Sequence, residues 1–311
     1  MQDTMDGPVR VAPIAGALGA ELSGIDLSRV GQSGSDTDAD ANFKIIHDAL
    51  MNYGVIFFRN QTLTRVAQLA FAKRFGRPEI HPIANGMQEY PEVIRVLKPA
   101  GEDAYFGTSW HTDNSFFEEP SSVTMLYGDR VPPVGGDTVW ASMETAYEHL
   151  SDSMKSKLEN LDAVHSAREA YDPRTTGDDR YTGNAAISYT FSESIYEEVV
   201  HPVIRVHPET GRKSIYVNPM FTQQIVGLNP AESDSLLNTL YAHSTRLEFT
   251  CRYRWQKGSV AIWDNRCVQH YAIDDYPDFD RIMYRVTICG DRPARGEPRV
   301  EILDRERIKD K

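Results

Sequence analysis

The stretch GSVAIWD, residues 258–264, is a short apolar run that begins at a glycine and ends at an aspartate. Similar runs, separated by Gly and Pro, recur along the chain beyond residue 80. Many short strands of this kind are typical of a β-barrel or β-sandwich rather than of alternating strand–helix units. The other runs are EVIRVLK (92–98), SSVTMLYGDRV (121–131), DTVWAS (137–142), HPVIRVHP (201–208), KSIYVNP (213–219) and IMYRVTICGD (282–291).

Helical segments are also predicted, because apolar residues recur at helical spacing in four stretches of the chain. In one of them Thr64 is placed to cap the start and Gly76 to cap the end. The polar stretch 31–42 is predicted to be a surface loop. The fold class expected is therefore α+β. The predicted helices are 43–53, 62–76, 143–161 and 230–245.

The charge balance argues against one large group of partners. The 311 residues include 33 Lys and Arg and 45 Asp and Glu, which gives a formal net charge of −12. Proteins that bind nucleic acid or an anionic membrane surface need a basic face. We therefore expect neither nucleic acid nor membrane as a partner.

The cysteine content and the apolar pattern indicate a cytoplasmic protein. Cys251, Cys267 and Cys289 lie far apart and form no CxxC motif, so free thiols in a reducing compartment are expected. No stretch approaches the about 18 consecutive apolar residues that a membrane helix needs. The N-terminal sequence MQDTMDGPVRV lacks the basic-then-apolar pattern of a signal peptide.

The tetrapeptide WHTD, residues 110–113, separates an imidazole from a carboxylate by one residue. In a strand, residues i and i+2 point to one face, so His111 and Asp113 would project together. A second imidazole would complete a set of two histidines and one carboxylate, which leaves coordination positions open in non-haem Fe(II) oxygenases. The alternative is an exposed pair at the end of a strand.

The C-terminal part of the chain carries a second imidazole and two cationic groups. His270 follows the run 258–264, and Arg281 and Arg285 follow His270 at intervals of 11 and 15 residues. On a regular strand, two residues four apart share a face. A guanidinium group suits bidentate capture of a carboxylate or a sulfonate.

These residues stand in ordered motifs that together resemble the TauD/TfdA family of Fe(II)- and 2-oxoglutarate-dependent dioxygenases. The resemblance covers residues 9–293, nearly the whole chain. It implies a double-stranded β-helix, or jelly-roll, core with flanking helices, in agreement with the many short strands. The motifs are WHTD (110–113), PPVGGDTVW (132–140), HPVIRVHPETGRKSIYVNPMF (201–221), AIWDNRCVQHYAIDDY (261–276) and RIMYRVTICGDRP (281–293).

The resemblance also implies how the chain is organised. Residues 1–311 would form a single dioxygenase domain with its core at 9–293. Independently of the resemblance, the polar, Tyr-rich and weakly periodic segment 166–200 is expected to be an active-site lid, with disorder as the alternative, because so long a loop in a compact domain is usually functional. The densely charged segment 294–311 is expected to be a solvated tail. Because family members often form dimers or tetramers, a homo-oligomer is expected.

Particular residues inherit roles from the resemblance. His111, Asp113 and His270 match the iron ligands. Arg281 and Thr138 match the pair that holds the distal carboxylate of 2-oxoglutarate, which reacts with O2 to give succinate and CO2. Related halogenases replace the carboxylate ligand with a small residue, so Asp113 favours hydroxylation.

For the substrate, the resemblance implies a small organic anion. Arg285 matches the arginine that binds the substrate's anionic group in taurine-cleaving members, and a buried guanidinium needs an anion, whether substrate or an internal Asp or Glu. Asn114 departs from the pattern, because taurine-cleaving members have an apolar residue there. The expected substrate-binding residues are His81, Asn114, Phe116, Tyr171, Phe221 and Arg285.

Alternatives of substrate and of class stay open. Sulfonates, alkyl sulfates and aryloxyalkanoates all fit an apolar pocket with a cationic end. The same chemistry could act on an amino acid or a natural-product intermediate in biosynthesis. A jelly roll that binds a metal or a ligand without turnover is a third possibility. We expect His165, His201 and His207 to be structural and Cys267 to be a packing residue.

Overall fold

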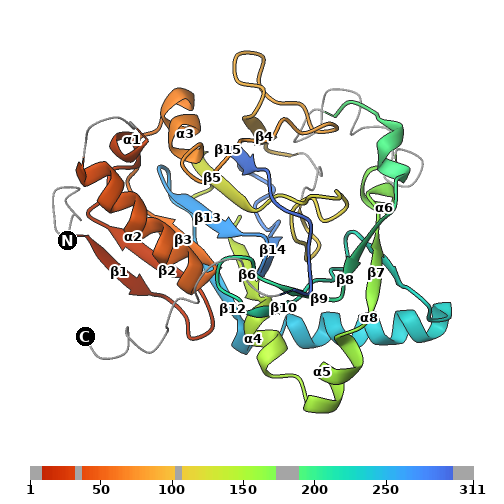
Figure 1. The fold of residues 1–311 in the computed structure, drawn as a ribbon. Coiled ribbons are helices and arrows are strands. Elements are labelled where there is room, and N and C mark those ends of the chain that lie inside the picture. Colours follow the sequence, from red (N-terminus) through yellow and green to blue (C-terminus); the bar gives the residue numbers. More distant parts are fainter. Residues whose placement is uncertain (1–8, 32–36, 102–106, 173–188, 297–311) are drawn as a thin grey trace.

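A computed structural model describes residues 9–31, 37–101, 107–172 and 189–296. Figure 1 shows that strands occupy the middle of the molecule and that helices lie outside them. A large sheet and a small sheet face each other, and side chains from both meet in one hydrophobic cluster between them. The functional residues discussed below come mainly from these two sheets and from a turn beside them.

The large sheet contains seven strands, which pair antiparallel except for the parallel pair β2–β3. At its centre, β5 lies between β13 and β15, so that Thr124 is paired with both Trp263 and Thr287. In spatial order the strands are β1 (Arg10–Pro13), β2 (Ala20–Ser23), β3 (Val55–Phe58), β13 (Val260–Asp264), β5 (Val123–Arg130), β15 (Arg281–Ile288) and β4 (Ile94–Lys98).

The outer face of the large sheet packs against three N-terminal helices, seen at the left of Figure 1. Val123 and Met125 of β5 belong to the cluster on this face, whereas Leu126 belongs to the inner one. Successive residues of a strand point to opposite faces, so β5 serves the outer core and the interior at once. The helices are α1 (Leu27–Val30), α2 (Thr37–Tyr53) and α3 (Arg65–Ala72).

The small sheet opposite the inner face is formed by β12 (Thr250–Tyr253), β6 (Thr138–Ser142) and β14 (Val268–Ala272). Aromatic rings fill the space between the two sheets. Phe57 stacks on Tyr253 with ring centroids 4.0 Å apart, and Trp140 meets Trp263 edge-on at 5.7 Å. Such pairs add to the stabilisation that burial of the rings provides.

A separate hydrophobic cluster joins most of the remaining strands to helices from the middle and later parts of the chain, which lie at the bottom of Figure 1. Among them, α8 begins with a capping box in which Asn229 and Glu232 satisfy each other's backbone N–H groups. These elements are β7 (Asp162–His165), β8 (Val199–Pro202), β9 (Ile204–Val206), β10 (Lys213–Ile215), β11 (Thr222–Ile225), α4 (Met143–Glu148), α5 (Asp152–Leu158), α8 (Pro230–Ser244) and the 3-10 helix η3 (Leu247–Phe249).

The helix predictions are confirmed in part. The predicted helix 230–245 is α8, and Thr64 caps α3 by accepting the backbone N–H of Ala67 at 3.1 Å. However, α3 ends at Ala72, because the chain continues in tighter turns before it reaches Gly76.

Two other boundaries were predicted wrongly. The segment 143–161 forms two helices instead of one, because the hydroxyl of Ser151 accepts the N–H of Met154 and starts α5. Helix α2 begins at Thr37, inside the segment 31–42 that was predicted to be a loop. Asp38 and Asp40 in its first turn favour helix initiation through the helix dipole.

The predicted lid, 166–200, is described only at its two ends. There the chain forms α6 (Arg168–Tyr171) and the 3-10 helix η2 (Glu193–Tyr196). Residues 173–188, and residues 297–311 of the predicted tail 294–311, lie outside the described residues. In the described part of the chain, no helix combines the length and the apolar character needed to cross a membrane.

Candidate active site

The two predicted ligands of the WHTD motif lie in a turn rather than in a regular strand. His111 makes an isolated bridge with His270, in which each backbone N–H donates to the other's carbonyl at 3.1 and 2.8 Å. Asp113 then lies in the turn, and Asn114 adopts a positive φ of 57°. Asn is one of the few residues that tolerates this left-handed conformation. The strand expected here was wrong, yet the two side chains do converge.

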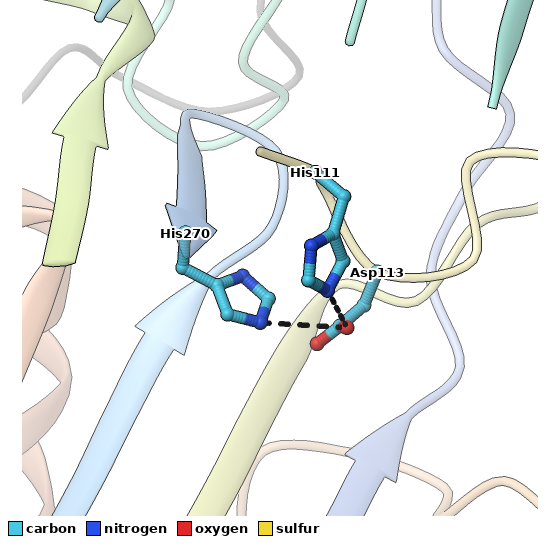
Figure 2. Close-up of side chains that lie close together, drawn as sticks. All are labelled: His111, Asp113 and His270. Atoms are coloured by element: carbon cyan, nitrogen blue, oxygen red, sulfur yellow. Dashed lines mark ion pairs between the residues drawn. The ribbon is translucent and has the colours of Figure 1, made fainter. Parts of the chain in front are cut away.

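The structure brings His111, Asp113 and His270 together (Figure 2). Oδ1 of Asp113 lies 3.6 Å from Nε2 of His111 and 3.8 Å from Nε2 of His270. Each side chain offers one ligand atom, all three atoms lie within 4.8 Å of one another, and all three residues are buried. This donor set suits a non-haem iron ion and leaves coordination positions open.

The protonation of these side chains also suits a metal. Nδ1 of His111 donates to the carbonyl of Ser109 at 2.7 Å, so in the neutral, metal-binding tautomer the lone pair belongs to Nε2, which faces Asp113. Burial, and then the neighbouring His111, lower the pKa of His270 well below its usual value, so its imidazole is neutral. Neutral imidazole is the form that binds metals.

Asp113 is held as a carboxylate by its neighbours. Burial alone would raise its pKa, but the charge of Arg285 holds the pKa of Asp113 well below its usual value. Nη2 of Arg285 lies 2.9 Å from Oδ1 of Asp113. The internal carboxylate that the sequence left open as a partner for Arg285 is therefore this predicted iron ligand.

A pocket opens beside the three residues, and one wall carries both arginines of β15. Arg281 and Arg285 pair with Lys98 and Ile94 of β4 in a regular ladder, so they share a face as predicted. The lining residues are Val96, Gly107, His111, Asp113, Leu126, Thr138, Trp263, His270, Ala272, Arg281 and Arg285.

Arg281 is a buried cation that lacks an ion-pair partner among the described residues. It is 7% exposed, and its Nε atom has no hydrogen-bond partner in the described part of the chain. Burial lowers its pKa, whereas the neighbouring Tyr276 and, more weakly, the charges of Asp274 and Asp137 act in the other direction. A buried guanidinium without a counter-ion is costly, so the site suits an anionic ligand.

Thr138 is oriented to serve the same ligand. Its Oγ1 accepts the indole N–H of Trp255 at 3.0 Å, which leaves the hydroxyl hydrogen free to donate. Asp275 secures the loop before Thr138, because its carboxylate accepts the N–H of Gly136 at 2.7 Å. A carboxylate between Arg281 and Thr138 would thus meet one charged donor and one neutral donor.

The predicted aromatic residues of the substrate site come together next to His111, but they do not border this pocket. Phe116 and Phe221 have ring centroids 4.9 Å apart, and Tyr171 lies 6.2 Å from Phe221 in a stacked arrangement. The ring of Phe221 lies 6.3 Å from that of His111, so this cluster packs against His111 outside the lining of the pocket.

His81 and Asn114 contact each other instead of the pocket. Nδ1 of His81 accepts the N–H groups of Ile83 and Ala84, so Nε2 carries the proton and donates to Oδ1 of Asn114 at 3.1 Å. Nδ2 of Asn114 donates to Oε2 of Glu79 at 2.9 Å. Burial, and then the charge of Arg285, lower the pKa of His81 to about 4.

Three contributors to the site were not predicted from the sequence. Glu79 accepts hydrogen bonds from Asn114, Ser121 and Thr287, and thereby joins the turn after Asp113 to the segment just before β5 and to β15. Thr124 and Asn265 bond to Asp113. Asn265 lies within a recognised motif and Glu79 lies two residues before His81, but neither was singled out, and Thr124 lay in a run predicted only to be a strand.

A second cluster of possible metal ligands, His207, Asp264 and Cys267, is buried near β13. Arg266 already occupies both carboxylate oxygens of Asp264, at 2.8 and 2.6 Å, and His207 lies 2.9 Å from Oδ2. Burial raises the pKa of the Cys267 thiol well above its usual value, so it is not a thiolate. This cluster is an internal ion network, in line with the structural roles expected for His207 and Cys267.

Comparison with known proteins agrees with this geometry. The model of the family described as taurine catabolism dioxygenase TauD, TfdA family, matches residues 10–287. The chain belongs to this family. The predicted α+β fold with a jelly-roll core is thereby confirmed, and so is the chemistry: TauD/TfdA enzymes of this kind are Fe(II)- and 2-oxoglutarate-dependent dioxygenases that consume O2.

Similar curated proteins and solved structures extend over nearly the whole chain. An alkylsulfatase of Acinetobacter baylyi is 38% identical over 91% of this chain and 86% of its own. An alpha-ketoglutarate-dependent sulfate ester dioxygenase of Pseudomonas putida is also 38% identical, over 91% and 90%. The crystal structure of a taurine dioxygenase from Burkholderia xenovorans is 36% identical, covers 93% of both chains and superposes with a TM-score of 0.75.

Proposed function

We propose that this dioxygenase hydroxylates a small organic anion, with a sulfate ester as the first candidate. His111, Asp113 and His270 would hold the iron, and Arg281 with Thr138 would hold the distal carboxylate of 2-oxoglutarate. When bound, iron and 2-oxoglutarate supply the activation of O2, with succinate and CO2 as products. The observation that carries the proposal is the buried cation of Arg281, which has no ion-pair partner among the described residues and lies in the pocket that the two histidines and Asp113 line.

The protein's own residues account for binding and orientation. Arg281 offers a forked donor that matches a carboxylate, and Thr138 adds a hydroxyl donor beside it. Neutral His270 and the ionised Asp113 keep the donor set ready for a divalent cation. The rings of Trp263 and Phe221, both buried, keep bulk water away from His270 and His111.

Arg285 would receive the anionic group of the substrate. Its ion pair with Asp113 engages Nη2, and a guanidinium has five N–H donors in a fork, so it can hold a second anion. Sulfate esters are the first candidate because the two curated relatives named above act on this class by their names. Hydroxylation of the carbon that bears the ester oxygen would release an aldehyde and sulfate.

A succinate-release screen tests this function. Fe(II)-loaded protein with 2-oxoglutarate and O2 is given alkyl sulfates, alkanesulfonates, aryloxyalkanoates, amino acids and neutral alcohols of matched chain length. The proposal expects stimulation by alkyl sulfates, with one sulfate released per succinate, and none by the alcohols. Stimulation by amino acids alone would favour a biosynthetic role. Absence of iron and 2-oxoglutarate binding would favour a non-catalytic jelly roll.

We also infer a single-domain, cytoplasmic protein that forms a dimer or tetramer and binds neither nucleic acid nor membrane. The three cysteines are free, which suits a reducing compartment, and the net charge is −12. Light scattering coupled to size-exclusion chromatography would measure the mass. A monomer at micromolar concentration would contradict the oligomer.

A further inference from the structure

The two carboxylate oxygens of Asp113 lie in different surroundings. Oδ1 faces His111, His270 and Arg285, at 3.6, 3.8 and 2.9 Å. Oδ2 instead lies 2.7 Å from the hydroxyl of Thr124, in the middle of the large sheet. The side chain of Asp113 thus presents one oxygen to the pocket and turns the other toward β5.

The direction of each hydrogen bond around Oδ2 follows from elementary donor rules. The indole N–H of Trp263 can only donate, and it lies 3.0 Å from Asn265, so the atom of Asn265 facing it is the carbonyl oxygen. The same oxygen accepts the backbone N–H of Asp113 at 3.2 Å. The amide nitrogen of Asn265 must then face Thr124, whose Oγ1 lies 2.8 Å away.

The hydroxyl of Thr124 therefore has a fixed role. Its oxygen accepts from Asn265, so its hydrogen is left for Oδ2 of Asp113. Thr124, Asn265 and Asp113 are 0, 1 and 3% exposed, so water cannot substitute for either partner. Unpaired polar groups at such depth are costly, and here none is left unpaired. We call this chain of hydrogen bonds from Asn265 through Thr124 to Asp113 the relay.

The sheet register holds this relay in place. Thr124 lies on β5, paired with Trp263 of β13 and with Thr287 of β15, and the three side chains share one face. Asn265 follows directly after β13. The contacts of the relay therefore come from the central strands of the large sheet. These strands are paired with other strands on both sides and cannot shift independently.

We propose that Thr124 and Asn265 are positioning residues that occupy Oδ2 of Asp113 and reserve Oδ1 for the metal. Asp113 would then bind through one oxygen, which keeps a coordination position from being taken by the second. This inference rests on the proposed function, because it assumes that Asp113 is an iron ligand. Outer hydrogen-bond partners of metal ligands are known to tune affinity in this way.

The first test compares Thr124→Val with Thr124→Ser. Val has the shape of Thr without the hydroxyl, whereas Ser keeps the hydroxyl and loses the methyl group. Anaerobic titration of metal-free protein with Co(II) measures affinity, and the visible Co(II) spectrum reports coordination. We expect T124V to bind Co(II) about 10- to 100-fold more weakly with an altered spectrum, and T124S to restore both. Wild-type affinity and spectrum in T124V would overturn the proposal.

The second test is made on wild-type protein and uses Asp113→Asn only to assign the band. Infrared difference spectra of Mn(II)-loaded wild-type protein with 13C-labelled aspartate separate one-oxygen from two-oxygen carboxylate binding by the splitting of the carboxylate bands. The proposal expects the wide splitting of one-oxygen binding for the band that disappears in Asp113→Asn. The narrow splitting of two-oxygen binding would overturn it, even if T124V failed to fold.

Failure of the relay and failure of the proposed function give different results. If His111→Ala binds Co(II) as tightly as wild type, the three residues are not the metal site and the proposed function fails. If His111→Ala loses Co(II) while T124V behaves as wild type, the metal site stands and the relay alone is rejected.

Discussion

Nη2 of Arg285 lies 2.9 Å from Oδ1 of Asp113, so the cation proposed to bind the substrate also contacts a proposed ligand of the metal. Both side chains are buried, at 5 and 3% exposure. Arrival of the substrate anion would therefore add a negative charge to an ion pair that already exists. Recognition of the anion would thereby be coupled to the charge around the carboxylate that is proposed to bind the metal.

Replacement of Arg285 should separate substrate binding from cofactor binding. Arg285→Gln removes the charge that pairs with the anion, and we expect the substrate KM to rise by about 10-fold or more. The KM for 2-oxoglutarate should change much less, because Arg281 is intact. Steady-state kinetics with the substrate found in the screen measures both. Full activity of R285Q would contradict the role of Arg285.

Arg281 should show a conflict between stability and function. Arg281→Met removes a buried guanidinium that has no ion-pair partner among the described residues. Without 2-oxoglutarate, the free energy of unfolding of the variant should therefore exceed that of the wild type by about 1 kcal/mol or more. Its affinity for 2-oxoglutarate should fall about 100-fold. Urea unfolding with and without 2-oxoglutarate measures both effects. A destabilised variant that still binds 2-oxoglutarate would be the opposite of this expectation.

Tyr276 should act on 2-oxoglutarate through Arg281. The two side chains are hydrogen-bonded, and Tyr276 packs against Lys98, whose Nζ lies 4.4 Å from the ring centroid. Tyr276→Phe keeps the ring and removes the hydroxyl, so we expect a rise of about 3- to 10-fold in the KM for 2-oxoglutarate. The substrate KM should stay near its wild-type value. A change in kcat alone would show that Tyr276 does not position Arg281.

His81 should make stability fall on mild acidification. Its pKa is lowered to about 4 in the folded protein, against about 6.5 in an unfolded chain. The unfolded state therefore takes up the proton first. The stabilisation that comes from the lowered pKa of His81 is fully present above pH 6.5 and is lost as the pH falls toward 4. The loss can reach about 3 kcal/mol. Urea unfolding at pH 7.5, 6 and 5 should show a smaller pH dependence for His81→Gln than for wild type.

The same variant tests the substrate role predicted for His81. Its Nε2–H is already donated to Asn114, whereas Arg285 keeps free donors. We therefore expect His81→Gln to raise the substrate KM less than R285Q does. An equal or larger rise would mean that Asn114 gives way and that His81 meets the substrate directly.

Patterns that depend on short spacing could be predicted from the sequence. The pair His111 and Asp113, the later His270, and the shared face of Arg281 and Arg285 all follow from motifs or from strand periodicity. The β-rich core of many short strands could be predicted from apolar runs that Gly and Pro residues separate. These features depend on residues that are close in the sequence, and such short-range patterns are what sequence periodicity can reveal.

Features that depend on strand neighbours could not be predicted in this way. Asn265 meets Asp113 and Thr124, from which it is 152 and 141 residues away in the chain, only because β13 pairs with β5 in a particular register. Glu79 likewise gathers Asn114 and Thr287 from remote segments. The break at Ser151 was missed for a different reason: its hydroxyl competes with the backbone and starts a new helix.

The central claim, that His111, Asp113 and His270 hold iron beside a 2-oxoglutarate site at Arg281, is tested most directly by an anaerobic optical titration. Fe(II)-loaded protein is titrated with 2-oxoglutarate, and the visible charge-transfer band of a keto acid chelated to Fe(II) is recorded. The band should appear in wild type, be lost in His111→Ala and require about 100-fold more 2-oxoglutarate in R281M. No band in wild-type protein, or an unchanged band in His111→Ala, would contradict the account.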